Sequence, residues 1–290
     1  MRLLPLLAAG LTLAFTSTVG AQQIESVEVR GPIHMLTGEG GNVGVLIGDD
    51  GTFMIDDKFA PLTDAILAEI DSLGGSPPTF LINTHFHGDH TGGNENLGKT
   101  GSTIVAHERV RQRLAEGSEI KAFDMTMAPQ SGAALPVITF SRDISFHLNG
   151  EDIDIEHVPD AHTDSDSIVY FRDTNVIHTG DTVFNGFFPF IDTAHGGTLK
   201  GMIAATERVL ALADDDTRII PGHGPLASKQ DVQTYRDMLT TVQQRLGKLK
   251  SKGLSAEEAV AEQPLADLEE EWGDGTFTAD RWIEIIYDGV

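Results

Sequence analysis

The stretch NTHFHGDHTGG, residues 83–93, crowds three histidines and one aspartate into six consecutive positions. These four residues are His85, His87, Asp89 and His90. They directly follow the apolar residues 80–82, which have the character of a short buried strand. Open α/β sheets place ligands at strand ends, and imidazole and carboxylate groups are ligands that zinc prefers. The stretch therefore has the composition of a metal-binding loop, with an ordinary solvated loop as the alternative.

Three more stretches offer the same side-chain types, and each lies next to a predicted strand. HVPDAHTDSD supplies His162, HTGDTVFN supplies Asp181 and IIPGHG supplies His223. Solvated loops would have to produce this pattern four separate times, whereas one shared metal centre explains it once. Two zinc ions about 3.5 to 4 Å apart need several such groups and a bridging carboxylate. The five histidines and two aspartates therefore predict a centre for metal ions.

Short alternating or apolar runs interleave with segments of helical spacing, and these elements must position the polar clusters. Strands are predicted at residues 26–36, 42–47, 52–55, 80–83, 144–148, 153–158, 168–171, 176–178 and 218–220. Helices are predicted at residues 61–73, 107–114, 199–212, 229–249 and 279–287. No Pro/Ser-rich linker divides the chain, so the pattern predicts one α/β domain built as two sheet-and-helix halves.

Taken together, HFHGDH, AHTDSD, HTGD and PGHG resemble the signature of the metallo-β-lactamase-fold hydrolase superfamily. The resemblance implies an α/β fold, an αββα sandwich of the metallo-β-lactamase type. It would be a single domain over residues 22–290 with a C-terminal helical extension from about residue 228. The resemblance also implies two zinc ions (Zn2+) per chain. One would be held by His85, His87 and His162, the second by Asp89, His90 and His223, and Asp181 would bridge them.

The same resemblance implies the metal and the reaction. Diiron members of the superfamily carry an acidic residue where this chain has His87, which favours zinc over iron and leaves manganese open. The expected activity is hydrolysis of an acyl bond in an ester, lactone, thioester or cyclic amide by a hydroxide that bridges the two metals. Asp89 would be the catalytic residue, since it can orient the water or pass on its proton. The alternative outside enzymes is a metal-binding scaffold without turnover.

A β-lactamase proper is the alternative among enzymes, but the sequence departs from that group. The main dizinc β-lactamases have a cysteine where this chain has Asp181, and a lysine three residues later where it has Phe184. An aspartate at the bridging position is similar to hydroxyacylglutathione hydrolases, lactonases and related esterases. Glutathione-binding members bring basic residues from a C-terminal extension, whereas the tail after Gly253 is acidic apart from Arg281.

Three further features lie near the predicted centre. His195, on the Gly-rich stretch PFIDTAHGGT, is a candidate for substrate contact. His178 precedes the turn that carries Asp181 and is a candidate for supporting it. The Gly-rich stretch TGEGGNVG, residues 37–44, lacks the lysine and helix of a phosphate loop, and we expect a mobile lid over the cleft.

The N-terminal residues and the composition limit where the protein is expected in the cell and what it is expected to bind. Residues 1–21 combine one arginine, an apolar run and a small-residue site, the pattern of a cleavable signal peptide, so we expect a periplasmic or secreted protein without membrane insertion after cleavage. The chain has no cysteine. Its formal net charge of -24 argues against binding to nucleic acid or anionic membranes. The expected partner is a small-molecule substrate, and the oligomeric state stays open.

Overall fold

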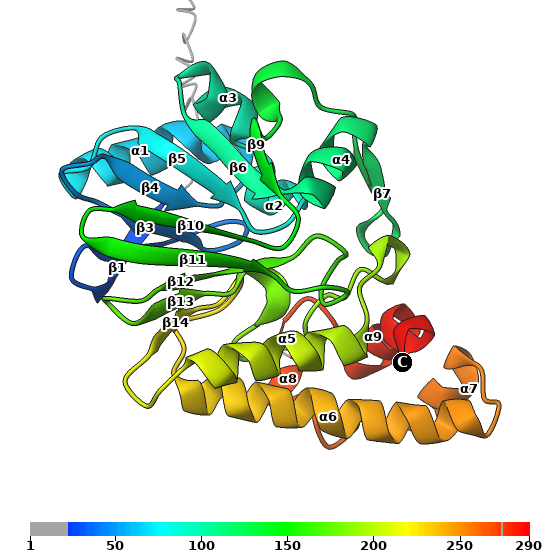
Figure 1. The fold of residues 1–290 in the computed structure, drawn as a ribbon. Helices are drawn as coiled ribbons and strands as arrows, with labels where there is room; N and C mark the ends of the chain where they lie inside the picture. Colours follow the sequence, from blue (N-terminus) through cyan, green and yellow to red (C-terminus); the bar gives the residue numbers. More distant parts are fainter. Residues whose placement is uncertain (1–22, 274) are drawn as a thin grey trace, which may run out of the picture.

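Two β-sheets packed face to face form the centre of the molecule, and helices cover the outer face of each (Figure 1). This arrangement is seen in a computed structural model that describes residues 23–273 and 275–290. The predicted signal peptide, residues 1–21, lies outside the described residues. The layer order confirms the predicted αββα sandwich in a single domain.

The first sheet has seven strands in the order β1-β2-β3-β4-β5-β6-β9. They are β1 (Glu25–Arg30), β2 (Ile33–Thr37), β3 (Val43–Leu46), β4 (Thr52–Ile55), β5 (Pro78–Asn83), β6 (Thr103–His107) and β9 (Ile138–Phe140). Strands β1 to β4 pair antiparallel, whereas β4, β5, β6 and β9 pair parallel. The carboxyl ends of β4 and β5 therefore meet at one edge of the sheet, where the HFHGDH motif begins.

The second sheet has five strands in the order β10-β11-β12-β13-β14. They are β10 (Asp143–Leu148), β11 (Glu151–His157), β12 (Ser167–Phe171), β13 (Val176–His178) and β14 (Arg218–Ile220). Only β13 and β14 pair parallel, so their carboxyl ends deliver the two loops with Asp181 and His223 to the same edge. A separate short hairpin joins β7 (Ser118–Ile120) to β8 (Met125–Met127).

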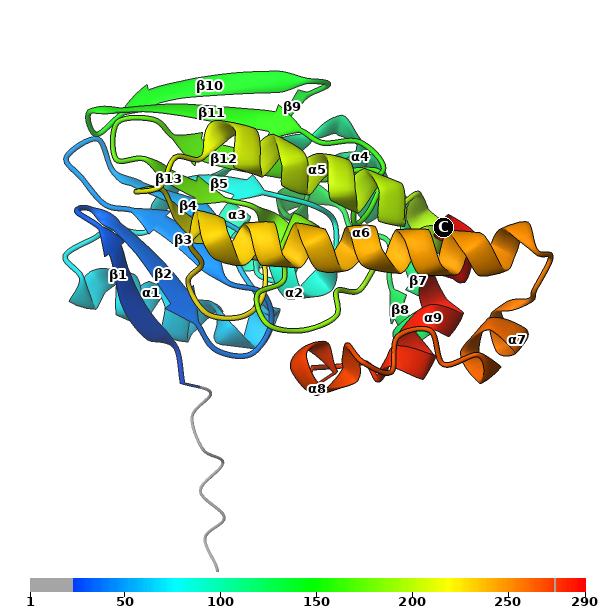
Figure 2. The same cartoon turned by 90° about the horizontal axis from the view of Figure 1, so that it is seen from below.

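Helices on the side of the first sheet are short, whereas the second sheet is covered by a long pair. The former are α1 (Thr63–Ser72), α2 (Gly88–Thr91), α3 (Asn94–Lys99) and α4 (Glu108–Glu116). The latter are α5 (Leu199–Leu212) and α6 (Lys229–Ser251), which lie side by side in Figure 2. The chain ends in α7 (Ala256–Ala261), α8 (Glu269–Trp272) and α9 (Ala279–Ile286). None of the helices in the described ranges is long and apolar enough to cross a bilayer.

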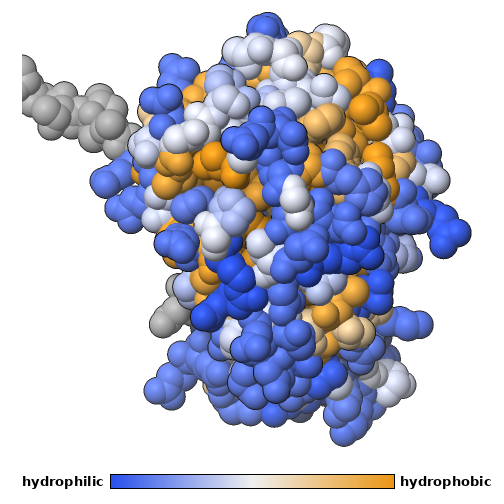
Figure 3. Space-filling view, turned by 60° about the vertical axis from the view of Figure 1, so that its left-hand side comes forward, coloured by the Kyte–Doolittle hydropathy of each residue, from blue (hydrophilic) through white to orange (hydrophobic). Residues whose placement is uncertain are grey.

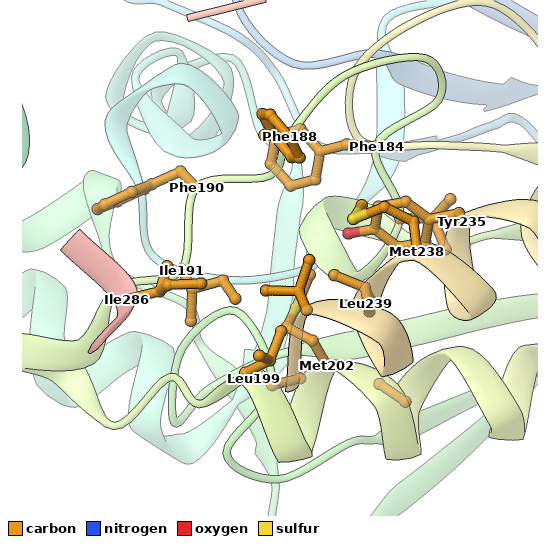
Figure 4. Packing of buried hydrophobic residues seen from close by; sticks show 14 of the residues in the cluster. Phe184, Phe188, Phe190, Ile191, Leu199, Met202, Tyr235, Met238, Leu239 and Ile286 are labelled. Atoms are coloured by element: carbon orange, nitrogen blue, oxygen red, sulfur yellow. The ribbon is translucent and has the colours of Figure 1, made fainter. Parts of the chain in front are cut away.

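Alternating side chains explain how the layers pack. In β11, Ile153 and Ile155 are fully buried between the sheets beside Phe53 and Phe171, while Asp152 and Asp154, which alternate with them, are half-buried. A larger apolar cluster fills the space between the second sheet, α5, α6 and the C-terminal helices (Figure 4). On the face drawn in Figure 3, hydrophilic residues cover most of the surface, with apolar residues showing mainly over its upper half.

The predicted elements of the second sheet match the structure closely, but the first half differs in its strands and in the short helices α2 and α3, which were not expected. The single strand expected at residues 26–36 is two strands, because the chain turns at Gly31, whose φ of 54° suits glycine. The region between the HFHGDH motif and residue 143 contains β6, β7, β8 and β9, none of which was expected. These strands are three to five residues long, too short for periodicity to reveal them.

Candidate metal centre

All seven predicted ligand residues converge at the edge where the two sheets meet. They form two groups in which the potential ligand atoms lie within 4.8 Å of one another. The first group is His85, His87, His162 and Asp181, and the second is Asp89, His90 and His223. The chain reaches this edge four times, because β5, β13 and β14 end there and the loop from β11 to β12 passes it.

The first group presents three imidazole nitrogens to one carboxylate. His162 Nε2 lies 2.8 Å from His87 Nδ1 and 3.5 Å from Asp181 Oδ2. His85 Nε2 lies 3.8 Å from the same carboxylate oxygen. Three imidazoles and one carboxylate around a common point make up a zinc-type ligand set.

The second group is built around Asp89, and Asp181 connects it to the first. His223 Nε2 lies 3.2 Å from Asp89 Oδ2, and His90 Nε2 lies 3.5 Å from it. Asp181 also reaches this group, since its Oδ1 is 3.0 Å from His90 Nε2 and its Oδ2 is 3.4 Å from His223 Nε2. Asp181 thus has the position between the groups that the bridging role requires.

The second nitrogen of most of these imidazoles is held by a neighbouring group, which fixes the ring orientation. These contacts are His85 Nδ1 to Thr84 Oγ1 at 3.1 Å, His87 Nε2 to Asp192 Oδ2 at 3.0 Å, His162 Nδ1 to the Phe190 carbonyl at 2.8 Å and His90 Nδ1 to Asp56 Oδ2 at 2.7 Å. In the described part of the chain, His85 Nε2 is buried without a hydrogen-bond partner. A buried unsatisfied group is costly, so this atom fits the ligand role.

The electrostatics of the site also suit a bound cation. Burial lowers the pKa of His85 well below its ordinary value and that of His162 to about 4, which keeps both rings neutral. Burial alone would raise the pKa of Asp181, but His90 and His223 hold it well below its ordinary value. Burial opposes protonation of His223 as well, yet Asp181 raises the pKa of that imidazole to about 9. The neutral rings of His85 and His162 beside the ionised carboxylate of Asp181 form an environment that a divalent cation would satisfy, and the proton held by His223 is one that a bound cation would displace.

Two supporting carboxylates were not recognised in the sequence. Asp56 directly follows β4, accepts hydrogen bonds from Thr84 N at 2.8 Å and Thr84 Oγ1 at 2.7 Å, and contacts His90. Asp192 binds His87 and His195 through the same oxygen. Asp56 follows a buried strand as the HFHGDH motif does, which is the pattern that could have revealed it. Asp192 is joined to His87 across 105 positions of sequence, and we find no local pattern that indicates it.

His195 and His178 both lie behind the centre. His195 is buried, its Nδ1 lies 2.7 Å from Asp192 Oδ2, and it is not among the described residues that line the cavity beside the metal centre. Substrate contact by His195 stays a prediction, and the observed contact is with Asp192. His178 Nδ1 accepts a hydrogen bond from Gly180 N at 3.2 Å, so it supports the turn that carries Asp181.

The Gly-rich stretch at residues 37–44 is hydrogen-bonded to the loop that carries His223, and its movement as a lid stays a prediction. Asn42 Nδ2 donates to the carbonyls of Pro221 and Gly224, at 3.0 and 2.9 Å. A Cβ on Gly41 would lie 2.1 Å from the His90 ring, so the backbone packs directly on that imidazole. The buried Lys58 donates to the Gly41 carbonyl. Gly41 therefore permits the backbone to pack closely on His90.

A cavity of about 420 Å³ opens beside the centre. Four metal-site residues contribute to its wall, namely His87, Asp89, Asp181 and His223. Most of the other lining residues are apolar: Phe59, Ile120, Phe123, Met125, Met127, Phe184, Phe187, Phe188, Phe190 and Phe277. A substrate in this cavity would therefore touch the polar centre on one side and aromatic rings on the others.

Two facing sheets with histidines and aspartates gathered at one edge define an αββα fold with a candidate dinuclear metal site. The chain belongs to the Metallo-beta-lactamase superfamily, whose sequence profile matches residues 36–223. It is similar to the hydroxyacylglutathione hydrolase of Nitrosococcus oceani, with 30% identity over 148 residues, which are 50% of this chain and 48% of that protein. The match thus spans about half the length of this relative.

Solved structures show the same fold. A metallo-beta-lactamase from Pontibacter korlensis superposes with a TM-score of 0.62 and 19% identity, over 75% of this chain and 99% of that chain. A double mutant of the sec-alkyl sulfatase PisA1 gives a TM-score of 0.71 and 18% identity, over 91% of this chain and 50% of that chain. At such identities the likeness establishes the fold, and the chemistry has to be argued from the site.

Proposed function

We propose that this protein is a dizinc hydrolase that cleaves an acyl bond in a small molecule. The observation that carries the proposal is the convergence of seven imidazole and carboxylate side chains in two adjoining groups at the wall of a cavity. Two metal ions in such a site supply an activated water at neutral pH and a Lewis acid for the substrate oxygen. Similarity to a hydroxyacylglutathione hydrolase supports hydrolysis of a thioester or a related ester.

The residues of the chain divide into holding and reacting roles. His85, His87 and His162 would hold one ion, and His90 and His223 would hold the other together with Asp89, with Asp181 shared. The side chain of Asp89 is 25% exposed against 4% for Asp181, and both line the cavity. Because Asp89 is the more accessible carboxylate, it would orient the attacking water and accept its proton.

Zinc is the metal we propose. Five imidazoles and two carboxylates without a thiolate suit zinc, and manganese would be expected with a larger share of oxygen ligands. Metal analysis of protein purified without added metal tests this choice. Manganese as the main metal in that analysis would contradict it.

The activity test is a hydrolysis panel with zinc-loaded protein. It covers aryl esters, lactones, thioesters, the β-lactam nitrocefin and phosphodiesters. We expect turnover of at least one ester, lactone or thioester that disappears on chelation. Activity confined to phosphodiesters would contradict acyl hydrolysis, and no turnover in any class would favour the scaffold without catalysis.

A β-lactamase proper ranks below this function. Phe184 lies where a lysine would be expected, and its ring stacks on His223 with centroids 5.2 Å apart. The position therefore offers no cation to a β-lactam carboxylate. We expect weak nitrocefin turnover, and an efficiency above about 10⁶ per molar per second would reverse this ranking.

We also propose that the protein is exported and acts on its substrate outside the cytoplasm. The support is the signal-peptide pattern of residues 1–21 and the absence of cysteine from the chain. Cell fractionation with N-terminal sequencing tests this. A mature protein that begins near residue 22 in the periplasm or medium is expected, and an uncleaved cytoplasmic chain would contradict it.

A further inference from the structure

The apolar wall of the cavity begins directly at the metal-site residues. Phe190 stacks on His87 with centroids 5.6 Å apart and planes 28° apart, and Phe184 stacks on His223 with planes 14° apart. Both phenylalanines belong to the buried cluster drawn in Figure 4, where their rings are labelled. The packed core holds these rings in place, so the surroundings of the reacting bond are fixed and aromatic.

The wall continues outward as a set of contacting rings from distant parts of the chain. Phe123 lies 4.9 Å from Phe190 and 5.7 Å from Phe277, measured between centroids. On the other side, Phe187 lies 5.7 Å from Phe184. The described residues that line the cavity include no lysine and no arginine. Away from the metal centre, the cavity thus offers apolar surface to a substrate.

Apolar side chains at the rim of the cavity are exposed to solvent. Phe123 is 41% exposed and lies on the segment that links β7 to β8, and Met125, the first residue of β8, is 42% exposed. An apolar group of a substrate would cover these side chains, and removing apolar surface from water is favourable. The cavity volume of about 420 Å³ is at the lower end of the usual range for small-molecule sites, so it suits one ring or a medium alkyl chain.

A charged group on the substrate has no comparable partner. Two metal ions could attract an anion next to the reacting bond, but a carboxylate placed further away would meet phenylalanine and methionine side chains. Burying a charge without a partner is unfavourable. The wall therefore discriminates against a substrate with an anionic group remote from its acyl bond.

We propose that the cavity selects acyl substrates whose group beyond the reacting bond is uncharged and apolar, such as an aromatic ring or a medium alkyl chain. The inference rests on the proposed acyl hydrolase function and adds the substrate class. It separates this protein from a thioesterase for glutathione, since glutathione carries two carboxylates. A neutral ester or lactone of low polarity is the substrate that this wall fits.

The first test compares aryl esters with a common leaving group on the zinc-loaded protein. The acyl parts are acetate, butanoate, hexanoate, glutarate and monomethyl glutarate, and the last two differ in one remote charge. We expect kcat/KM to rise at least about tenfold from acetate to hexanoate, as methylene groups in apolar pockets allow. The glutarate ester should fall at least about tenfold below its methyl ester. Equal values within this pair, or no rise with chain length, would overturn the proposal.

A substitution at the rim makes the comparison specific to the cavity. Phe123→Lys places a cation on an exposed position of the lining, so the glutarate ester should gain about threefold to fivefold relative to its methyl ester. Val137→Lys is the matched control, because Val137 is 71% exposed and lies outside the lining. The control should leave the ratio unchanged. The same shift in both variants would mean that general charge, not the cavity wall, sets the preference.

A binding measurement keeps this inference separate from the proposed function. Hexanohydroxamic acid and its analogue with a terminal carboxylate would be titrated into zinc-loaded protein by calorimetry. Tighter binding of the neutral compound by at least about tenfold supports the apolar cavity even if no ester is hydrolysed, and in that case the hydrolase proposal alone fails. Equal or weaker binding of the neutral compound contradicts the substrate class even where esters are turned over.

Discussion

Asp89 differs from Asp181, the other acidic residue of the metal centre, because its side chain is more exposed in the cavity that both residues line. Asp181 is 4% exposed and surrounded by imidazoles, whereas the Asp89 side chain is 25% exposed. Asp89 Oδ2 lies near His223 and His90, and among the described residues neither of these two contacts uses Oδ1, so Oδ1 can face water. The two carboxylates therefore differ in role, since Asp181 joins the two ligand groups and Asp89 can take part in the reaction.

Replacement of Asp89 tests this role. Asp89→Asn keeps the size of the side chain but removes its charge, so kcat on the best ester should fall at least about hundredfold with zinc still bound. Steady-state kinetics with zinc analysis on the same sample measures both. Asp154→Asn, which changes a 41% exposed carboxylate on β11, should leave kcat within a few fold. Normal turnover by Asp89→Asn at full zinc occupancy would remove its catalytic assignment.

Asp192 is the clearest example of a residue that acts through a proposed ligand. Its carboxylate contacts His87 Nε2 at 3.0 Å and leaves Nδ1 facing the metal centre. Asp192→Asn should weaken zinc binding about tenfold to hundredfold, measured by competition with a chelator. Asp152→Asn alters a similar but exposed pair with His147 and serves as the control. An unchanged zinc affinity in Asp192→Asn would show that this carboxylate does not position His87.

At the scale of elements, the loops after β5, β13 and β14 and the loop from β11 to β12 carry the centre, and the Gly-rich stretch at residues 37–44 packs against it. Gly41 has no room for a side chain, because an added Cβ would lie 2.1 Å from the His90 ring. Gly247, in α6, has nothing within 4 Å of an added Cβ. A methyl group would therefore clash with His90 at Gly41 and would fit without a clash at Gly247.

These glycines give opposite expectations for the same substitution. Gly41→Ala should lower the free energy of unfolding and weaken zinc binding, because His90 must move. Gly247→Ala should raise the free energy of unfolding by about 1 kcal/mol, because alanine is the better helix former. Denaturant unfolding and zinc titration of both variants measure the contrast. Wild-type zinc affinity in Gly41→Ala would show that the stretch moves freely, as the sequence had led us to expect.

Local sequence patterns predicted much of the second sheet and the clusters of metal-site residues, because each strand and each cluster lies within a short continuous segment. The strand at Glu151–His157 shows its burial in alternating residues, and HFHGDH lies in one continuous segment. The carboxylates that orient the histidine rings were not predicted, since Asp192 contacts His87 only in the folded chain. The cavity was not predicted for the same reason: Phe59, Phe123 and Phe277 are far apart in the sequence and meet in its wall.

At the scale of the whole molecule, two sheets bring four separated segments to one edge and thereby assemble the metal centre. The layers leave the ligand atoms in two groups that Asp181 connects, an arrangement consistent with the two ions that we propose. That the protein does not bind nucleic acid stays a prediction from its formal charge of -24. The function we propose thus depends on the centre and the cavity beside it.

The most direct test of the account is the zinc content of the folded protein. Purified chain lacking residues 1–21 would be incubated with zinc, freed of loosely bound metal by dialysis, and analysed for zinc per chain by elemental analysis. We predict about two zinc ions per chain, because the seven side chains form two ligand groups joined by one carboxylate. Asp181→Ala, measured in parallel, should lose one of them. One zinc ion or none in the unaltered protein under zinc-replete conditions would contradict the dinuclear centre.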